Sequence, residues 1–255
     1  MRIRDALLAL AGRPSPTLLA VSLAGWILLL GLDREMQVSS LCLSQVTLTA
    51  VARGAFAMAF AANPLAMLSW LAMLLAMMSP LLRQPIAQLR LRSLARRRRR
   101  AVAWFVAGYG AVWMMAGLVL MTAAAILGPF AGETGVPALL IAAVMAVAWQ
   151  MTPLRQHALI RCHRLPGLSA FGGEAYRDCI RFGVTHGLWC VATCAPLMLV
   201  PLSAPEIHLP LMAALSAGLL LERQAPPRRP AWSAQIVPGQ RVAARLVRSI
   251  RWSIP

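Results

Sequence analysis

Three side chains that can bind a metal ion recur at four-residue spacing in one apolar stretch of the chain. His186, Cys190 and Cys194 lie within residues 183–198. Residues four apart on a helix lie one turn above each other, so the three would form a ladder with rungs about 6 Å apart. An imidazole and two thiols are soft ligands that suit Cu(I) or Zn(II). The alternative is an interior histidine beside two thiols that pack as small apolar groups.

The length of the ladder limits which rungs can hold one ion. The outer two would lie about 12 Å apart, too far for metal–ligand bonds of about 2.0–2.3 Å. We therefore expect His186 with Cys190, or Cys190 with Cys194, completed by ligands from another helix such as Met73 or Met77. The many methionines favour Cu(I) over zinc, although methionine also fills cores. A cysteine ligand must lose its proton, so affinity should fall as the pH drops.

A second group of candidate ligands lies in a basic segment. Cys162 and His163 are adjacent, and His157 lies five residues before Cys162. They could receive or sense a metal, although the surrounding arginines repel a cation. The chain has 5 cysteines, an odd number without a regular framework. This count argues against a disulfide-stapled secreted fold.

The composition is that of a membrane protein. Hydrophobic residues make up 59% of the chain and charged residues 13%, whereas soluble domains have about 45–50% and about 25%. We predict an all-α, polytopic membrane protein in which a domain at 15–222 joins a basic N-terminus (1–14) to a basic tail (223–255). Its six transmembrane helices are predicted at about 15–32, 64–82, 101–127, 136–151, 181–202 and 207–221. A loop is predicted at 152–180, and the mixed segment 34–57 is either interfacial or inserted.

The positive charge is arranged in blocks. All 25 basic residues are arginines, against 8 acidic residues, which gives a formal net charge of +17. The segments 1–14, 83–100, 152–181 and 222–255 hold 23 of the 25 arginines. Cytoplasmic loops are enriched in arginine, so this pattern predicts that both termini are cytoplasmic. It favours anionic lipid, rather than nucleic acid, as the partner of the arginine-rich loops.

Features of an enzyme are missing. The chain has no phosphate-binding loop, no dinucleotide-binding glycine pattern, no Ser-His-Asp candidate set and no CxxC motif. The predicted spans contain no Asp, Glu, Lys or Arg away from their ends. Proton-coupled carriers rely on such buried ionisable groups. The sequence therefore favours binding over catalysis.

Several short motifs occur in a recognisable order. In chain order they are Trp70 with Met73 and Met77-Met78-Ser79-Pro80, Gly108-Tyr109 with Trp113, Gln150-Met151-Thr152-Pro153-Leu154, and His186-Gly187-Leu188-Trp189-Cys190 ending in Leu197-Met198. Together they resemble a bacterial family described as predicted metal-binding integral membrane proteins of unknown function. The resemblance covers about residues 64–223. Members tend to carry a further cysteine where this chain has Thr193, and a cysteine pair that is reduced here to Cys162, with Ala158 at the other position.

The ladder and the resemblance together predict a protein of the bacterial inner membrane that binds copper for handling, delivery or transport. A metal carrier or a membrane complex would be its protein partner. One alternative is a structural or assembly subunit without metal. The other is a membrane thiol oxidoreductase, although a Cys190–Cys194 disulfide within one helix would be strained.

Overall fold

The computed structural model describes residues 16–32, 64–127, 136–164, 166–167, 169, 173–224 and 230–232. These residues are helical, with no strand among them, so the predicted all-α class is confirmed for this part of the chain. The predicted N-terminus at 1–14, the mixed segment 34–57 and most of the tail at 223–255 lie outside the described residues.

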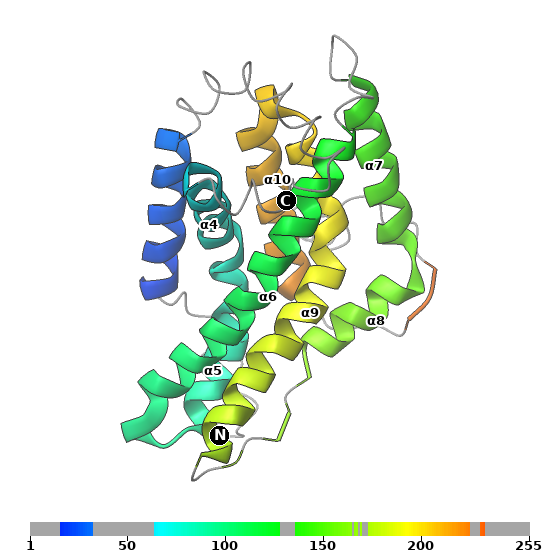
Figure 1. Ribbon diagram of the computed structural model, residues 1–255. Helices are drawn as coiled ribbons and strands as arrows, with labels where there is room; N and C mark the ends of the chain where they lie inside the picture. Colours follow the sequence, from blue (N-terminus) through cyan, green and yellow to red (C-terminus); the bar gives the residue numbers. More distant parts are fainter. Residues whose placement is uncertain are drawn as a thin grey trace, which may run out of the picture. The chain divides into compact units, whose positions relative to one another are not determined.

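The helices follow the predicted apolar segments closely (Figure 1). In chain order they are Pro16–Leu32, α4 (Pro64–Met78), η1 (Pro80–Leu82), α5 (Arg83–Arg92), η2 (Ala95–Arg97), α6 (Arg98–Leu127), α7 (Val136–Met151), α8 (Pro153–Cys162), α9 (Glu174–Leu202), η4 (Pro205–Ile207) and α10 (His208–Gln224). The predicted loop at 152–180 is wrong over α8, because Thr152 and Pro153 start a new helix there. It is also wrong over 174–180, because α9 begins at Glu174 rather than at 181.

The number of membrane-spanning helices stays a prediction. Among the described residues, two helices are long and apolar enough to cross a membrane, at Ala95–Ala124 and Glu174–Leu202. Two further helix pairs qualify if each bent pair is counted as one span: Pro64–Met78 with Pro80–Arg92, bent by 45°, and Pro137–Met151 with Pro153–Cys162, bent by 71°. Helix Pro16–Leu32 is apolar but shorter. Length and composition thus support two to four spans among the described residues, and the predicted six spans stay unconfirmed.

The bend between α7 and α8 has a local cause. The Thr152 hydroxyl accepts the backbone N–H of Arg155 at 3.3 Å and donates to the Trp149 carbonyl at 2.8 Å. Thr152 therefore caps the N-terminus of α8, and Pro153 occupies the first helical position, where no N–H is needed. The two residues end one helix and begin another in a new direction.

The bend after α4 also involves a proline. Pro80 has no N–H to donate to the Ala76 carbonyl, the usual acceptor four residues earlier. The Ser22 hydroxyl from helix Pro16–Leu32 donates to that carbonyl at 2.7 Å instead. Gly25 lets the two helices approach, because a Cβ there would lie 2.5 Å from the Ala76 nitrogen. The carbonyl that Pro80 leaves without an N–H partner thus forms a hydrogen bond between α4 and helix Pro16–Leu32.

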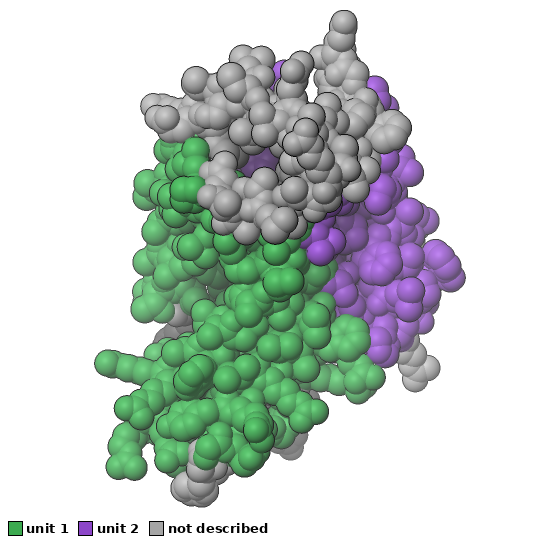
Figure 2. All heavy atoms as spheres, viewed as in Figure 1, with its two compact units in different colours: residues 1–39, 60–118, 161–191 green, residues 40–59, 119–160, 192–255 purple. Residues whose placement is uncertain are grey.

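The helices group into two compact units, coloured separately in Figure 2. Unit 1 comprises residues 1–39, 60–118 and 161–191, and unit 2 comprises 40–59, 119–160 and 192–255. His186 and Cys190 belong to unit 1, whereas Cys194 belongs to unit 2.

Candidate metal centre

The imidazole of His186 lies among three aromatic rings in unit 1. The ring centroids of Phe105, Tyr109 and Phe182 each lie 5.9 Å from the imidazole centroid. Phe105 and Tyr109 come from α6, and Phe182 lies one turn before His186 on α9. His186 is only 5% exposed. We call these three rings the aromatic cage; they enclose the imidazole in an apolar environment.

Cys190 lies one helical turn beyond His186 and is 1% exposed. Its Sγ accepts a hydrogen bond from the Tyr109 hydroxyl, with 3.3 Å between oxygen and sulfur. Tyr109 therefore contacts both candidate ligands, since its ring is beside His186 and its hydroxyl meets Cys190. The donated hydrogen bond holds the sulfur on the face of α9 that His186 also occupies.

Glycines allow α6 and α9 to approach closely enough for these contacts. A Cβ on Gly183 would lie 2.1 Å from the Phe105 carbonyl oxygen, and one on Gly108 would lie 2.6 Å from the Ile180 oxygen. Gly187, four residues after Gly183, would bring a Cβ to 3.0 Å from Val112. Small residues four apart let helix backbones meet at short distance. This glycine seam positions the cage around His186.

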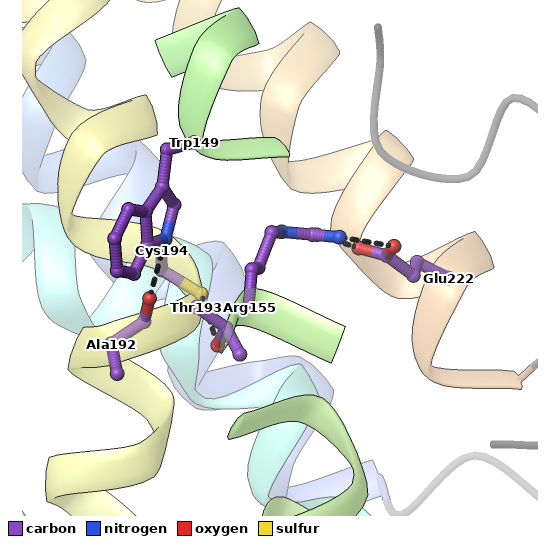
Figure 3. Close-up of polar contacts among 6 residues, drawn as sticks. All are labelled: Trp149, Arg155, Ala192, Thr193, Cys194 and Glu222. Carbon is purple, nitrogen blue, oxygen red and sulfur yellow. Dashed lines mark hydrogen bonds and ion pairs between the residues drawn. The ribbon is translucent and has the colours of Figure 1, made fainter. Parts of the chain in front are cut away.

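The third rung of the predicted ladder lies in unit 2. Cys194 is fully buried, and its Sγ is 3.4 Å from the Thr193 hydroxyl (Figure 3). Thr193 is itself 1% exposed. Among the described residues, no group of three or more His, Cys, Asp or Glu side chains could hold one metal ion. The role of the three rungs as metal ligands stays a prediction.

The other predicted ligands are buried but lie apart from the ladder in sequence. Met73 and Met77 are 3% and 1% exposed on α4, which contacts α6 where the Trp70 indole donates to the Trp113 carbonyl at 3.1 Å. Cys162 ends α8 and is also buried. Their predicted role as metal ligands stays a prediction.

None of the four described cysteines, at 162, 179, 190 and 194, forms a disulfide. Burial, together with the neighbouring Asp178 carboxylate, raises the pKa of the Cys179 thiol. A metal ligand must be a thiolate, so a raised pKa works against ligation by this cysteine. Cys179 precedes the predicted span at 181–202.

A buried ion pair in unit 2 was not predicted. Arg155 on α8 is fully buried, and its guanidinium makes two hydrogen bonds to the Glu222 carboxylate on α10, one of them 2.9 Å between Nη1 and Oε1 (Figure 3). Arginine and carboxylate groups match in this two-bond arrangement. Sequence alone placed Arg155 in a basic loop, and helical periodicity gave no sign that α8 buries it.

Sequence reasoning also missed the cage. Tyr109 occurred only within a family motif, and Phe105 and Phe182 were not singled out. Their spacing held a signal, because Phe105 and Tyr109, like Phe182 and His186, are four apart and so share a helix face. That the two faces meet is decided by the packing of α6 on α9.

Comparison with known proteins gives one match. A protein-family model described as "PpoB2: Copper chaperone" matches residues 67–244, which is more than half of the chain. The matched region contains every candidate ligand named above. No curated protein and no solved structure matches the chain.

Proposed function

Because this chain belongs to the PpoB2 copper chaperone family, we propose that His186 and Cys190 hold Cu(I) as the cargo that the protein delivers. Copper handling follows from the family; the choice of residues is our inference. The observation that carries it is the contact of one residue, Tyr109, with both side chains. Two soft ligands that lie one turn apart and share a packing partner are suited to bind one ion together.

The donor set favours Cu(I) over Zn(II) in this proposal. Structural zinc sites are four-coordinate, and catalytic ones have three protein ligands and a water. No such cluster of His, Cys, Asp or Glu occurs among the residues that the structure describes. Soft thiolate and imidazole ligands in small number suit a monovalent copper ion, and a thioether from Met73 or Met77 would be a compatible third ligand.

We further propose that the protein acts in the bacterial inner membrane, with about six spans and both termini in the cytoplasm. The long apolar helices and the blocks of arginine support this location. Arg90, Arg92 and Arg96–Arg100 would lie against anionic lipid headgroups on the cytoplasmic side. A protein that supplies or receives copper would be the partner.

Metal binding by the purified full-length protein tests the proposal. Cu(I) titration against a chelator of known affinity should give about one ion per chain. Cys190→Ser should weaken Cu(I) binding at least about tenfold, which corresponds to about 1.4 kcal/mol. His186→Gln should weaken it similarly, because it removes the second ligand.

Cys179→Ser is the matched control, since Cys179 is also buried, free and on α9. It should bind Cu(I) as the parent does. A parent protein that takes up no copper, or a Cys190→Ser variant with unchanged affinity, would overturn the assignment. Loss of binding in the Cys179→Ser variant as well would show that any buried thiol change disturbs the helix.

A further inference from the structure

The aromatic cage places rings from both α6 and α9 around His186. Three rings from two helices surround one imidazole, and two of them, Phe105 and Phe182, also pack on each other with centroids 4.9 Å apart. Phe105 is 0% and Phe182 is 3% exposed. A metal ligand normally needs space beside it for the ion and for the other ligands of the ion.

We propose that Phe105, Tyr109 and Phe182 determine the specificity of the site, so that it accepts a soft monovalent cation and rejects Zn(II). This inference rests on the proposed function, because it assumes that His186 and Cys190 hold the cargo. It assigns a role to residues that are not themselves ligands.

Ligand number is the first reason. The rings occupy space around the imidazole that additional side chains or water molecules would need. Zn(II) requires four ligands, so a shell in which rings take the place of several donors or waters disfavours it. Cu(I) and its larger analogue Ag(I) form stable complexes with fewer ligands. The same shell therefore reduces their binding affinity less than that of Zn(II).

Charge is the second reason. A divalent ion loses more hydration energy than a monovalent ion when it enters an apolar environment without compensating charges. The faces of aromatic rings attract cations, and this attraction is strongest when the cation has lost its water. Tyr109 contacts both ligands, so an ion shared by His186 and Cys190 would lie next to its ring.

The test compares the binding of Cu(I) and Zn(II) to the full-length protein by chelator competition. Phe105→Leu and Phe182→Leu each keep an apolar side chain but remove the ring face and free some space. Each variant should lower the ratio of Cu(I) to Zn(II) affinity by about tenfold, a typical size for a dehydrated cation–ring contact. Ag(I) should follow Cu(I), because it has the same charge and a similar preference for soft ligands.

Trp113→Phe is the matched control. Trp113 is a fully buried ring that contacts Tyr109, with centroids 6.4 Å apart, but it is outside the cage. Its indole nitrogen has no hydrogen-bond partner, so the change removes no bond. The variant should keep the metal preference of the parent. A thermal unfolding curve for each variant separates lost selectivity from lost folding.

The outcomes distinguish the cage from the copper site. If the parent binds Cu(I), but its ratio of Cu(I) to Zn(II) affinity is no higher than that of either leucine variant, the cage inference alone is overturned. A leucine variant in which the affinities for Cu(I) and Zn(II) fall equally would also overturn the cage inference, since structural damage has that effect. A parent that binds no metal would overturn the proposed function and the cage together.

Discussion

The indole Nε1 of Trp149 on α7 donates a hydrogen bond to the Ala192 carbonyl on α9 at 2.8 Å (Figure 3). That carbonyl needs an outside donor because Pro196, four residues later, has no N–H. The same arrangement occurs in unit 1, where Ser22 donates to the Ala76 carbonyl that Pro80 leaves without a partner. In both units, a proline within a helical segment creates an acceptor that a neighbouring helix uses.

A double-mutant cycle can measure this relationship. Trp149→Phe should destabilise the protein by about 1–3 kcal/mol, because it leaves the Ala192 carbonyl without a donor. In a Pro196→Ala background the helix supplies its own N–H, so the same Trp149→Phe change should cost much less. The measurement is thermal or denaturant unfolding of the four proteins in detergent, and equal costs in both backgrounds would contradict the explanation.

The buried Arg155–Glu222 pair should contribute far more to the free energy of unfolding than a surface ion pair does. Glu222→Gln leaves a fully buried guanidinium without its counter-charge, and breaking such pairs costs about 3–5 kcal/mol. Glu174→Gln is the control, since the Glu174 and Arg177 side chains are 69% and 78% exposed and such pairs contribute about 0–1 kcal/mol. Unfolding midpoints that drop equally for both variants would show that the buried pair has no special role.

The glycine seam predicts opposite effects for two glycine-to-alanine changes. Gly183→Ala would place a methyl group 2.1 Å from the Phe105 carbonyl oxygen, so α6 and α9 must separate, at a cost of about 1–3 kcal/mol. Gly110→Ala meets nothing within 4 Å and should stabilise α6 by up to about 1 kcal/mol, since alanine favours helix. The seam would be refuted by equal stability of the two variants.

The predicted topology can be tested with reporter fusions. The distribution of arginine predicts that both termini and the segments 83–100 and 152–180 are cytoplasmic. A cytoplasmic reporter fused after residue 95, 165 or 240 should therefore be active at each position. A periplasmic signal at 95 or 165 would contradict the six-span arrangement, and it would also remove anionic cytoplasmic lipid as the partner of those arginines.

The sequence by itself determined where the helices form, because helix formation depends on runs of apolar residues and on local signals. The segment 136–151 was predicted from its apolar run and agrees with α7, Val136–Met151. The spacing of His186 and Cys190 likewise follows from helix geometry alone. Local signals also misled over 152–180, since Thr152 and Pro153 begin α8 and Glu174 begins α9 within the segment predicted as a loop.

Only the tertiary structure decided which helix faces meet. The contact of Tyr109 with Cys190 joins residues 81 apart in sequence, and that of Arg155 with Glu222 joins residues 67 apart. No local pattern selects such pairs, because each depends on which two helices pack together. For Tyr109 and Cys190, glycines permit the close approach of α6 and α9. The ladder was therefore visible in the sequence, whereas the cage around its first rung required α6 to be packed against α9.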